Sequence, residues 1–354
     1  MTVGTAHHSM ECLVEELFQP TAVAYPDGSL GAELELIPVR PVNHRRVGID
    51  DAASGPGSAS AVREAARANG WTEQTDAYGA PDWVTPEGGR IGYEPGGQIE
   101  ISSPVFQSAE GLALFLGRTV TALRQSAAPA DIELLTLGID PYNAIEDVAT
   151  ELHAPRYDDM VRHFNSIGPS GARMMRQTAS LQLNVELGPD PLARWSLLNA
   201  LAPYLTAKFA NSRCYANSDT GFASYRARLW QALDASRTGI PFNASDPIGA
   251  YALFARRAAR IMSDDRLHLS TLFPEVRPRG YFELRSMDAM EPARADEAIR
   301  FVAALIHDAD VAAEAARVLG SPDVNLLARA AISGRSDRQL DDRLRVLESI
   351  AAGA

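Results

Sequence analysis

Five short segments of this chain alternate apolar and polar residues with a period of two, and this pattern constrains the fold more than any other feature. The segments are 31–37, 98–103, 133–139, 180–187 and 281–287. Because successive side chains of an extended chain point to opposite sides, each segment is predicted to be a strand with one apolar and one polar face. Helices are expected in the stretches between them. The sequence therefore predicts an α+β fold with a mainly antiparallel sheet.

The C-terminal part of the chain has a helical pattern instead. Apolar residues recur there at spacings of three and four, in two groups: Val302, Leu305, Ile306 and Ala309, then Leu340, Leu344 and Leu347. This spacing predicts a helical region over 291–354, packed on the same domain as a catalytic core over 1–290. Within the core, the segment "DDAASGPGSAS" (50–60) is rich in turn residues and is predicted to be a mobile loop.

Composition and missing motifs exclude several classes of function. The formal net charge is -12, which disfavours nucleic acid and anionic membranes as partners. No uninterrupted apolar run has the length of a membrane span, and the first residues lack a signal-peptide pattern, so a cytoplasmic location is expected. The two cysteines, Cys12 and Cys214, have no CxxC spacing. Walker A, GxGxxG, HExxH and GxSxG motifs are also absent from the sequence.

The polar faces of four predicted strands carry oxygen-bearing side chains. Glu33 and Glu35 share one face of their segment, and the two-residue step separates them by about 6.5–7 Å. The corresponding residues of the other three segments are Gln98, Glu100 and Ser102; Gln182, Asn184 and Glu186; and Glu283 with Arg285. Such a face could simply be solvated, as in many antiparallel sheets. Solvated faces, however, normally mix lysine, threonine and arginine among the acids, and here acids and amides dominate.

Carboxylate and amide oxygens without many cations are the ligands that a hard divalent ion prefers. Mg²⁺ is usually held by few carboxylates and shares its remaining positions with phosphate. Arg285 lies on the same face, two residues after Glu283, and its planar donor fork suits a phosphoryl group. The residues therefore favour a Mg²⁺ site for a phosphorylated nucleotide.

Several longer motifs resemble a known family. They include "GAELEL", "YEPGGQIEISSP", "PRYDDMVRHFNSIGPSGARMMRQTASLQLNVEL", "FANSR", "RLWQALDASRTGIPF" and "HLSTLFPEVRPRGYFELRSMD". In this order they resemble the glutamate-cysteine ligase family of the plant and actinobacterial type, and they look closest to the bacterial ligases of ergothioneine synthesis. The resemblance implies a fold like the catalytic domain of glutamine synthetase, in which a curved sheet forms a funnel-shaped active site with helices outside.

The resemblance also implies a reaction and the residues that carry it. In that reaction ATP phosphorylates the γ-carboxyl of L-glutamate, and the amine of L-cysteine then displaces phosphate. The implied Mg²⁺ and ATP shell is Glu33, Glu35, Glu94, Glu100, Gln182, Asn184 and Glu283. Arg237 is implied to bind the glutamate carboxylate, with Thr178 and Ser180 lining the same pocket. Glu35 and Arg285 are the expected catalytic residues, and Arg285 also the phosphate-binding one.

Alternatives remain open on the residues alone. "RTG" at 237–239 is also an ordinary helix-end sequence. His163 could serve as a base or make a structural hydrogen bond, and Trp230 and Tyr225 are more typical of packing. Nothing in the sequence fixes the acceptor, so a ligase with a different amine acceptor is one alternative. A catalytically silent nucleotide-binding homologue is another.

Overall fold

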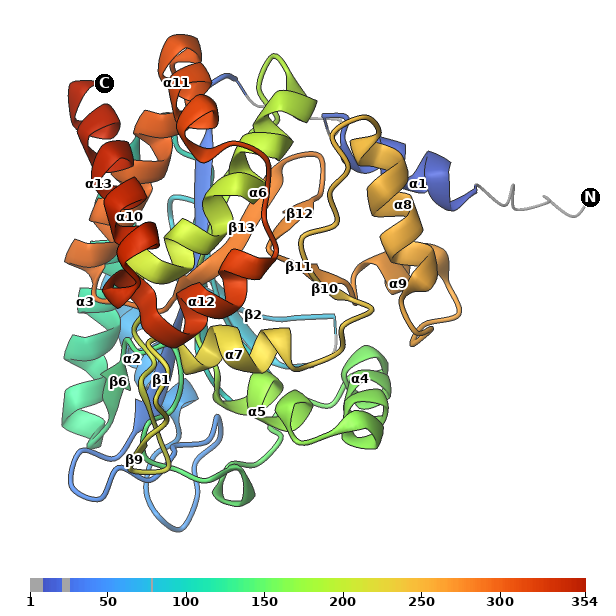
Figure 1. Cartoon of the computed structure of the whole chain (residues 1–354). Coiled ribbons are helices and arrows are strands. Elements are labelled where there is room, and N and C mark those ends of the chain that lie inside the picture. Colours follow the sequence, from blue (N-terminus) through green and yellow to red (C-terminus); the bar gives the residue numbers. More distant parts are fainter. Residues whose placement is uncertain (1–8, 21–25, 78) are drawn as a thin grey trace, which may run out of the picture.

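The computed structural model describes residues 9–20, 26–77 and 79–354, and within them a large sheet lies among helices (Figure 1). The strands are β1 (Leu30–Val39), β2 (Thr72–Thr75), β3 (Pro81–Val84), β4 (Arg90–Tyr93), β5 (Ile99–Ser102), β6 (Glu133–Leu135), β7 (Ser180–Val185), β8 (Cys214–Tyr215), β9 (Ser218–Asp219), β10 (Thr238–Gly239), β11 (Phe273–Pro274), β12 (Val276–Pro278) and β13 (Phe282–Asp288). The helices are α1 (Met10–Leu17), α2 (Ser58–Asn69), α3 (Ala109–Ala127), α4 (Pro155–Ile167), α5 (Ser170–Gln177), α6 (Pro191–Lys208), α7 (Tyr225–Gln231), α8 (Pro247–Arg257), α9 (Asp265–Leu269), α10 (Pro292–Ile306), α11 (Ala309–Leu319), α12 (Asn325–Ser333) and α13 (Arg338–Gly353). Short 3-10 helices lie at Ala128–Ala130, Ile145–Asp147 and Gly334–Ser336.

The main sheet confirms the predicted fold class, because all of its strand pairs are antiparallel. Its order is β12-β13-β7-β1-β5-β4-β3-β2, and β6 also pairs with β1. The three strands with polar faces richest in acids and amides, β1, β5 and β7, are therefore direct neighbours. This order brings residues from three distant parts of the chain onto one surface.

Each of the five predicted segments contains a strand, and the largest difference in bounds is at β6. β6 ends at Leu135, whereas the alternation extended to Ile139. Beyond Leu135 the chain turns to the segment after α6: the side chain of Asn211 donates to the carbonyl of Thr136, and the amide of Gly138 donates to the carbonyl of Asn211. The competing hydrogen bonds therefore end the strand early.

The alternation also decides which face of the sheet enters the core. Leu34, Leu36, Leu181, Leu183 and Leu284 have no measurable exposure. Their face is covered by α3 and α6, which are in turn covered by α10, α12 and α13. In Figure 1, α3, α10 and α13 lie on one side of β1, and α4, α8 and α9 lie on the other. The polar face thus has a separate cover, made of short helices.

The C-terminal region is helical, as predicted, with one boundary error. Leu340, Leu344 and Leu347 lie on α13 and are fully buried. α10, however, ends at Ile306, and Ala309 begins α11, so Ala309 does not continue the face of Val302. A division into a core up to residue 290 and a helical region after it stays our proposal, which the packing of α10 on α3 and of α12 on α6 supports.

The predicted loop 50–60 is shorter in the structure. Residues 50–57 form turns, but α2 begins at Ser58. The amide of Gly57 and the hydroxyl of Ser60 both donate to a carboxylate oxygen of Asp51, which fixes the start of the helix. The mobility of this loop stays a prediction.

Candidate active site

A deep pocket lies over the polar face of the sheet. Its floor comes from β1, β5, β7 and β13, and its walls come from α4, α5, α7 and the segment 266–279. Of the predicted site residues, the lining includes Glu33, Glu35, Glu94, Glu100, Thr178, Ser180, Gln182 and Arg285. The structure therefore brings together eight of the eleven residues that the sequence and the resemblance singled out.

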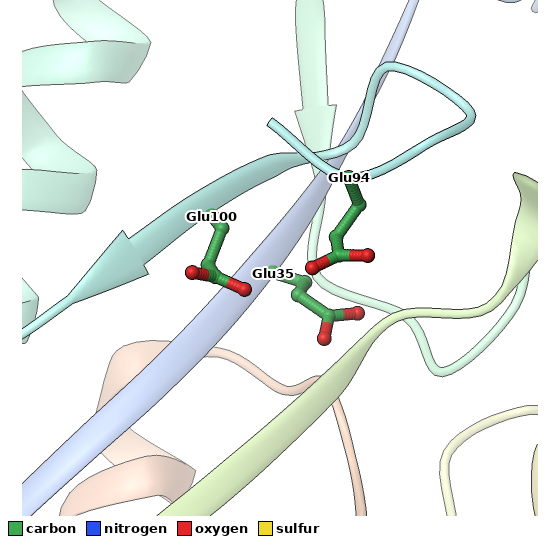
Figure 2. Close-up of side chains that lie close together, drawn as sticks. All are labelled: Glu35, Glu94 and Glu100. Atoms are coloured by element: carbon green, nitrogen blue, oxygen red, sulfur yellow. The ribbon is translucent and has the colours of Figure 1, made fainter. Parts of the chain in front are cut away.

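Three carboxylates converge at the centre of this pocket. Glu35 on β1, Glu94 in the turn after β4 and Glu100 on β5 each place an oxygen within 4.8 Å of the other two. Figure 2 shows the three side chains turned toward one another from separate parts of the chain. Glu35 and Glu100 are directly opposite in the antiparallel register of β1 and β5. Like charges facing each other in this way destabilise a sheet, and carboxylate oxygens this close together could hold a cation.

Three carboxyls of the pocket, those of Glu33, Glu35 and Glu94, have raised pKa values. Burial, followed by repulsion from Glu100, raises the pKa of Glu35 to about 7. Burial and the same neighbour raise the pKa of Glu94 well above its ordinary range. Burial, Glu100 and Glu283 raise the pKa of Glu33 to about 8. A divalent cation among these oxygens offsets both causes, and oxygen ligands of this kind suit Mg²⁺.

The local structure holds these acids in place. The backbone amide and the hydroxyl of Ser180 donate to Glu35 over 3.0 and 2.8 Å, and the hydroxyl of Ser102 donates to Glu100 over 2.9 Å. Gln182 also donates an amide hydrogen to Glu35 over 3.3 Å. These neutral donors orient the carboxylates without cancelling their charge.

The two glycines of "EPGGQ" serve the turn that carries Glu94. Gly97 has a φ of 78°, which a residue with a side chain rarely adopts. A Cβ on Gly96 would lie 2.2 Å from the carbonyl oxygen of Arg176 at the end of α5. The glycines therefore let the turn close and let it pack directly on α5.

Glu283 lies outside the carboxylate cluster, and its role as a metal ligand stays a prediction. Its side chain is fully buried, and both oxygens accept hydrogen bonds: from Arg277 over 2.6 and 3.0 Å, from Arg279 over 3.3 Å and from Arg285 over 2.9 Å. Burial alone raises its pKa, but Arg277 and Arg285 outweigh burial and hold the pKa of Glu283 well below its ordinary range. Glu283 is thus the shared counter-ion of three arginines.

These three arginines place positive charge on the pocket surface. Arg277, Arg279 and Arg285 all line the pocket, and one carboxylate cannot balance three guanidinium groups. Arg285 also donates to the side-chain oxygen of Gln182, which in turn contacts Glu35. The pocket therefore places a cluster of carboxylates beside a cluster of guanidinium groups, and Gln182 is hydrogen-bonded to both.

Arg237 and Asn184 lie outside this pocket. The guanidinium of Arg237 is fully buried and donates to Asp234, to the carbonyl and hydroxyl of Thr271 and to the carbonyl of Ala259. In this position it joins the segment after α7 to the segments after α8 and α9, and its role in binding the glutamate carboxylate stays a prediction. Asn184 lines a separate hollow at the far end of β1, because it lies one step further along β7 than Gln182.

His163 and Asp234 complete the network around Arg237. Nε2 of His163 lies 3.0 Å from an oxygen of Asp234, the same oxygen that accepts from Arg237. This contact favours the structural interpretation of His163 over a role as a base. Burial alone raises the pKa of Asp234, but Arg237, Ser236 and His163 lower it overall.

Sequence reasoning missed several residues of the pocket. Arg277 on β12 lies opposite Glu283 in the hairpin register, and Arg279 follows two residues later, so their spacing was a usable signal. Gln98 was already placed on the polar face with Glu100 by the alternation, and its side-chain amide donates to the carbonyl of Thr178 over 2.8 Å. Tyr157 and the methionines of α4 and α5 gave no such signal, because only the tertiary structure brings these helices over the sheet.

Comparisons with known proteins identify the family. The sequence profile of glutamate-cysteine ligase family 2 matches residues 29–349. The chain belongs to this family. It is therefore a ligase, and the pocket over the sheet is its candidate active site.

Individual relatives agree with this assignment. The glutamate-cysteine ligase EgtA of Mycolicibacterium smegmatis is 32% identical over 293 residues, which are 72% of this chain and 68% of that protein. EgtA of Mycobacterium tuberculosis is 30% identical over 316 residues, 76% of this chain and 71% of that protein. The chloroplastic glutamate-cysteine ligase of Brassica juncea is 29% identical over 259 residues, 62% of this chain but only 50% of the plant protein.

Among solved structures, a bifunctional glutathione synthetase from Pasteurella multocida matches 98% of this chain with a TM-score of 0.49 and 14% identity. The chain spans 48% of that protein. A glutamate-cysteine ligase from Francisella tularensis in complex with AMP matches 93% of this chain and 83% of its own, with a TM-score of 0.45 and 10% identity. In the part of the chain that the structure describes, no helix has the length and apolar character of a membrane span.

Proposed function

We propose that this protein is an ATP-dependent ligase that joins the γ-carboxyl of L-glutamate to the amine of L-cysteine through a γ-glutamyl phosphate. Membership of the ligase family supports the reaction class, and the two relatives named EgtA support the choice of substrates. The observation that carries the proposal is the cluster of Glu35, Glu94 and Glu100 in the same pocket as Arg285. The resemblance of its motifs to ligases of ergothioneine synthesis supports that pathway as its setting.

The residues of the pocket fit Mg²⁺ as a cofactor. Glu35, Glu94 and Glu100 are the proposed ligands, with Glu33 and Gln182 beside them on the floor of the pocket. The raised pKa values of Glu33, Glu35 and Glu94 indicate negative charge that lacks compensation. When bound, Mg²⁺ supplies charge neutralisation for the phosphate oxygens of ATP.

The side chains of the protein contribute positioning and electrostatic stabilisation. A carboxylate is a poor electrophile, so its activation depends on holding the γ-carboxyl of glutamate in line with the transferring phosphoryl group. We place the guanidinium of Arg285 next to that group. Its hydrogen bonds to Gln182 and Glu283 fix its position. Thr178 and Ser180 line the pocket beside Glu35, where we place the glutamate.

Water must be excluded while the acyl phosphate waits for the amine. The helices α4, α5 and α7 cover the polar face of the sheet with largely apolar side chains, which supports this role. Because the reaction consumes ATP, we place the protein in the cytoplasm. A ligase with another amine acceptor fits the same geometry, since activation of glutamate does not depend on the acceptor.

The order of chemical steps tests the proposal. With ATP, Mg²⁺ and glutamate alone, we expect slow release of ADP. Addition of cysteine is expected to accelerate the release of ADP and phosphate together, with one of each per γ-glutamyl amide detected by mass spectrometry. If another amine gives this stoichiometry and cysteine does not, the acceptor is wrong and the reaction class stands. If no amine in a broad panel stimulates ADP release by the folded protein, the proposal fails and a silent homologue is the better description.

A further inference from the structure

One buried arginine, Arg46, has no part in the chemistry described above. Its side chain is 6% exposed and lies in the segment that follows β1. It is not among the residues that line the pocket. Burial lowers the pKa of Arg46, and the nearby charges of Asp140 and Glu151 offset this only in part. The position of this charge therefore needs an explanation other than contact with a substrate.

The guanidinium of Arg46 is poorly paired for a buried charge. Its Nη2 donates to the carbonyl of Gly96 over 2.6 Å, and its Nη1 lies 3.6 Å from a carboxylate oxygen of Asp140. Within the described residues, Nε and Nη1 have no hydrogen-bond partner. Unpaired donors on a buried charge cost stability. The one short hydrogen bond of this side chain goes to the turn that carries Glu94.

Arg46 connects the strand of Glu35 to the turn of Glu94. Its backbone forms an antiparallel bridge with Val39, the last residue of β1, and Glu35 lies four residues before Val39 on the same strand. Its side chain reaches the turn at Gly96, two residues after Glu94. One residue outside the pocket thus links the two elements that carry these carboxylates.

Neighbouring contacts fix both ends of this link. The amide of Glu151 donates to the carbonyl of Pro95 over 2.7 Å, so this carbonyl and the next one, which Arg46 holds, are both bound by distant segments. At the other end, the carbonyl of His44 accepts a hydrogen bond from the side chain of Asn143 over 2.8 Å. The backbone before Arg46 is therefore anchored, and a change in its side chain is expected to move the turn.

We propose that Arg46 is a positioning residue that sets the place of Glu94 against Glu35 and so makes the carboxylate cluster selective for a small divalent cation. This inference rests on the proposed function, in which the cluster holds Mg²⁺. Mg²⁺ demands near-ideal geometry at about 2.0–2.1 Å, whereas Ca²⁺ tolerates flexible sites at about 2.3–2.6 Å. Replacing a residue that orients a metal ligand typically lowers metal affinity by about 10–100-fold. A looser turn is expected to lose more affinity for Mg²⁺ than for Ca²⁺.

Metal binding by the full chain without substrates tests the proposal. Arg46→Met removes the charge and the donor to Gly96, and Arg46→Lys keeps the charge on a different head group. Isothermal titration calorimetry measures the dissociation constants for Mg²⁺ and Ca²⁺. For Arg46→Met, we expect the Mg²⁺ constant to rise by about tenfold or more and the Ca²⁺ constant by less than about threefold. The constants of Arg46→Lys are expected to fall between those of Arg46→Met and wild type.

The matched control is Arg40→Met. Arg40 belongs to the same segment, and its guanidinium donates to the carbonyls of Ala130, Asp131 and Pro56 over 2.6 to 3.1 Å. None of these carbonyls belongs to the turn of Glu94. Arg40→Met is expected to lower the free energy of unfolding in urea, because it removes these bonds, while both dissociation constants stay within about twofold of wild type.

Three results overturn the proposal. The first is an unchanged Mg²⁺ constant in Arg46→Met, or in Arg46→Lys should Arg46→Met not fold. The second is an equal rise in the Arg40→Met control, which assigns the effect to a general loss of stability. The third is a wild-type protein that binds neither cation. Turnover of wild type with the amine panel decides the proposed function separately, so a ligase with unchanged metal selectivity in the variants refutes only the role of Arg46.

Discussion

Replacement of Glu35 by Gln is expected to stabilise the protein at alkaline pH while removing its response to Mg²⁺. Burial and Glu100 raise the pKa of this carboxyl from an ordinary 4.5 to about 7. A folded-state pKa above the unfolded one means that ionised Glu35 costs stability, and that this cost grows as the pH rises through the folded-state value. At 1.36 kcal/mol per pKa unit, the cost is about 3 kcal/mol at pH 8.5 and about 1 kcal/mol at pH 5.

The amide side chain of the Glu35→Gln variant also loses hydrogen-bond energy. Ser180 donates two hydrogen bonds to the carboxyl, and the amide oxygen can accept only part of this pair, which costs about 1–2 kcal/mol. The expected balance in EDTA is a free energy of unfolding about equal to wild type or slightly lower at pH 5, and about 1–2 kcal/mol higher at pH 8.5. Relief of the repulsion on Glu100 acts in the same direction.

Urea denaturation at the two pH values, with and without Mg²⁺, measures both effects. At pH 8.5, Mg²⁺ at 100 times its dissociation constant is expected to stabilise wild type by about 2.7 kcal/mol and the variant far less, together with a loss of turnover. Glu133→Gln is the control, because Glu133 is exposed on β6, and it is expected to change stability by less than about 0.5 kcal/mol at both pH values. A variant that is destabilised equally at pH 5 and pH 8.5, or that keeps the full response to Mg²⁺, refutes the carboxylate cluster as a metal site.

Arg279→Gln is expected to raise the KM for ATP by about tenfold with little effect on the KM for glutamate, because it removes one of the donors beside the phosphate site. Initial-rate kinetics measure both KM values. The control is Arg300→Gln, on the exposed face of α10. Arg237→Lys is expected to lower the free energy of unfolding by about 2–4 kcal/mol, since lysine cannot replace all the buried hydrogen bonds of the guanidinium; a raised KM for glutamate without loss of stability in urea would instead restore its predicted role as a substrate ligand. Gly96→Ala is expected to weaken stabilisation by Mg²⁺ in thermal unfolding, because its Cβ would collide with the backbone of Arg176 and displace the turn of Glu94; an unchanged Mg²⁺ response contradicts this.

The placement of several site residues could be predicted because it depends on local geometry. Side chains of a strand alternate between its two faces, whatever the strand packs against. Glu33 and Glu35 therefore had to share a face, and burial of the alternating Leu34 and Leu36 turns this face away from the core. The same reasoning placed Gln182 and Glu100 correctly, and the structure confirms that all four line one pocket.

Residues whose role depends on partners distant in the sequence could not be placed in this way. Glu283 lies on the polar face, as expected for a metal ligand, but the hairpin register places Arg277 directly opposite. Both carboxylate oxygens of Glu283 are therefore in an ion pair. Arg237 matches a family motif, yet its guanidinium donates hydrogen bonds to carbonyls of two other segments. In both cases the sequence shows the charge and the spacing of the residue. Its hydrogen-bonding partner depends on the packing of distant segments.

The sequence by itself determined the strands, their polar faces and the carboxylates available on them, because a period of two is written in the covalent chain. Only the tertiary structure decided which carboxylates meet. Strand order set β1 between β5 and β7, and the tight turn at Gly97 brought Glu94 to Glu35 and Glu100. The apolar wall of the pocket is a product of packing, since its residues Met160, Met175, Trp230 and Phe273 come from α4, α5, α7 and β11. Burial of apolar surface determines where these helices lie. The sequence of a single helix does not specify that position.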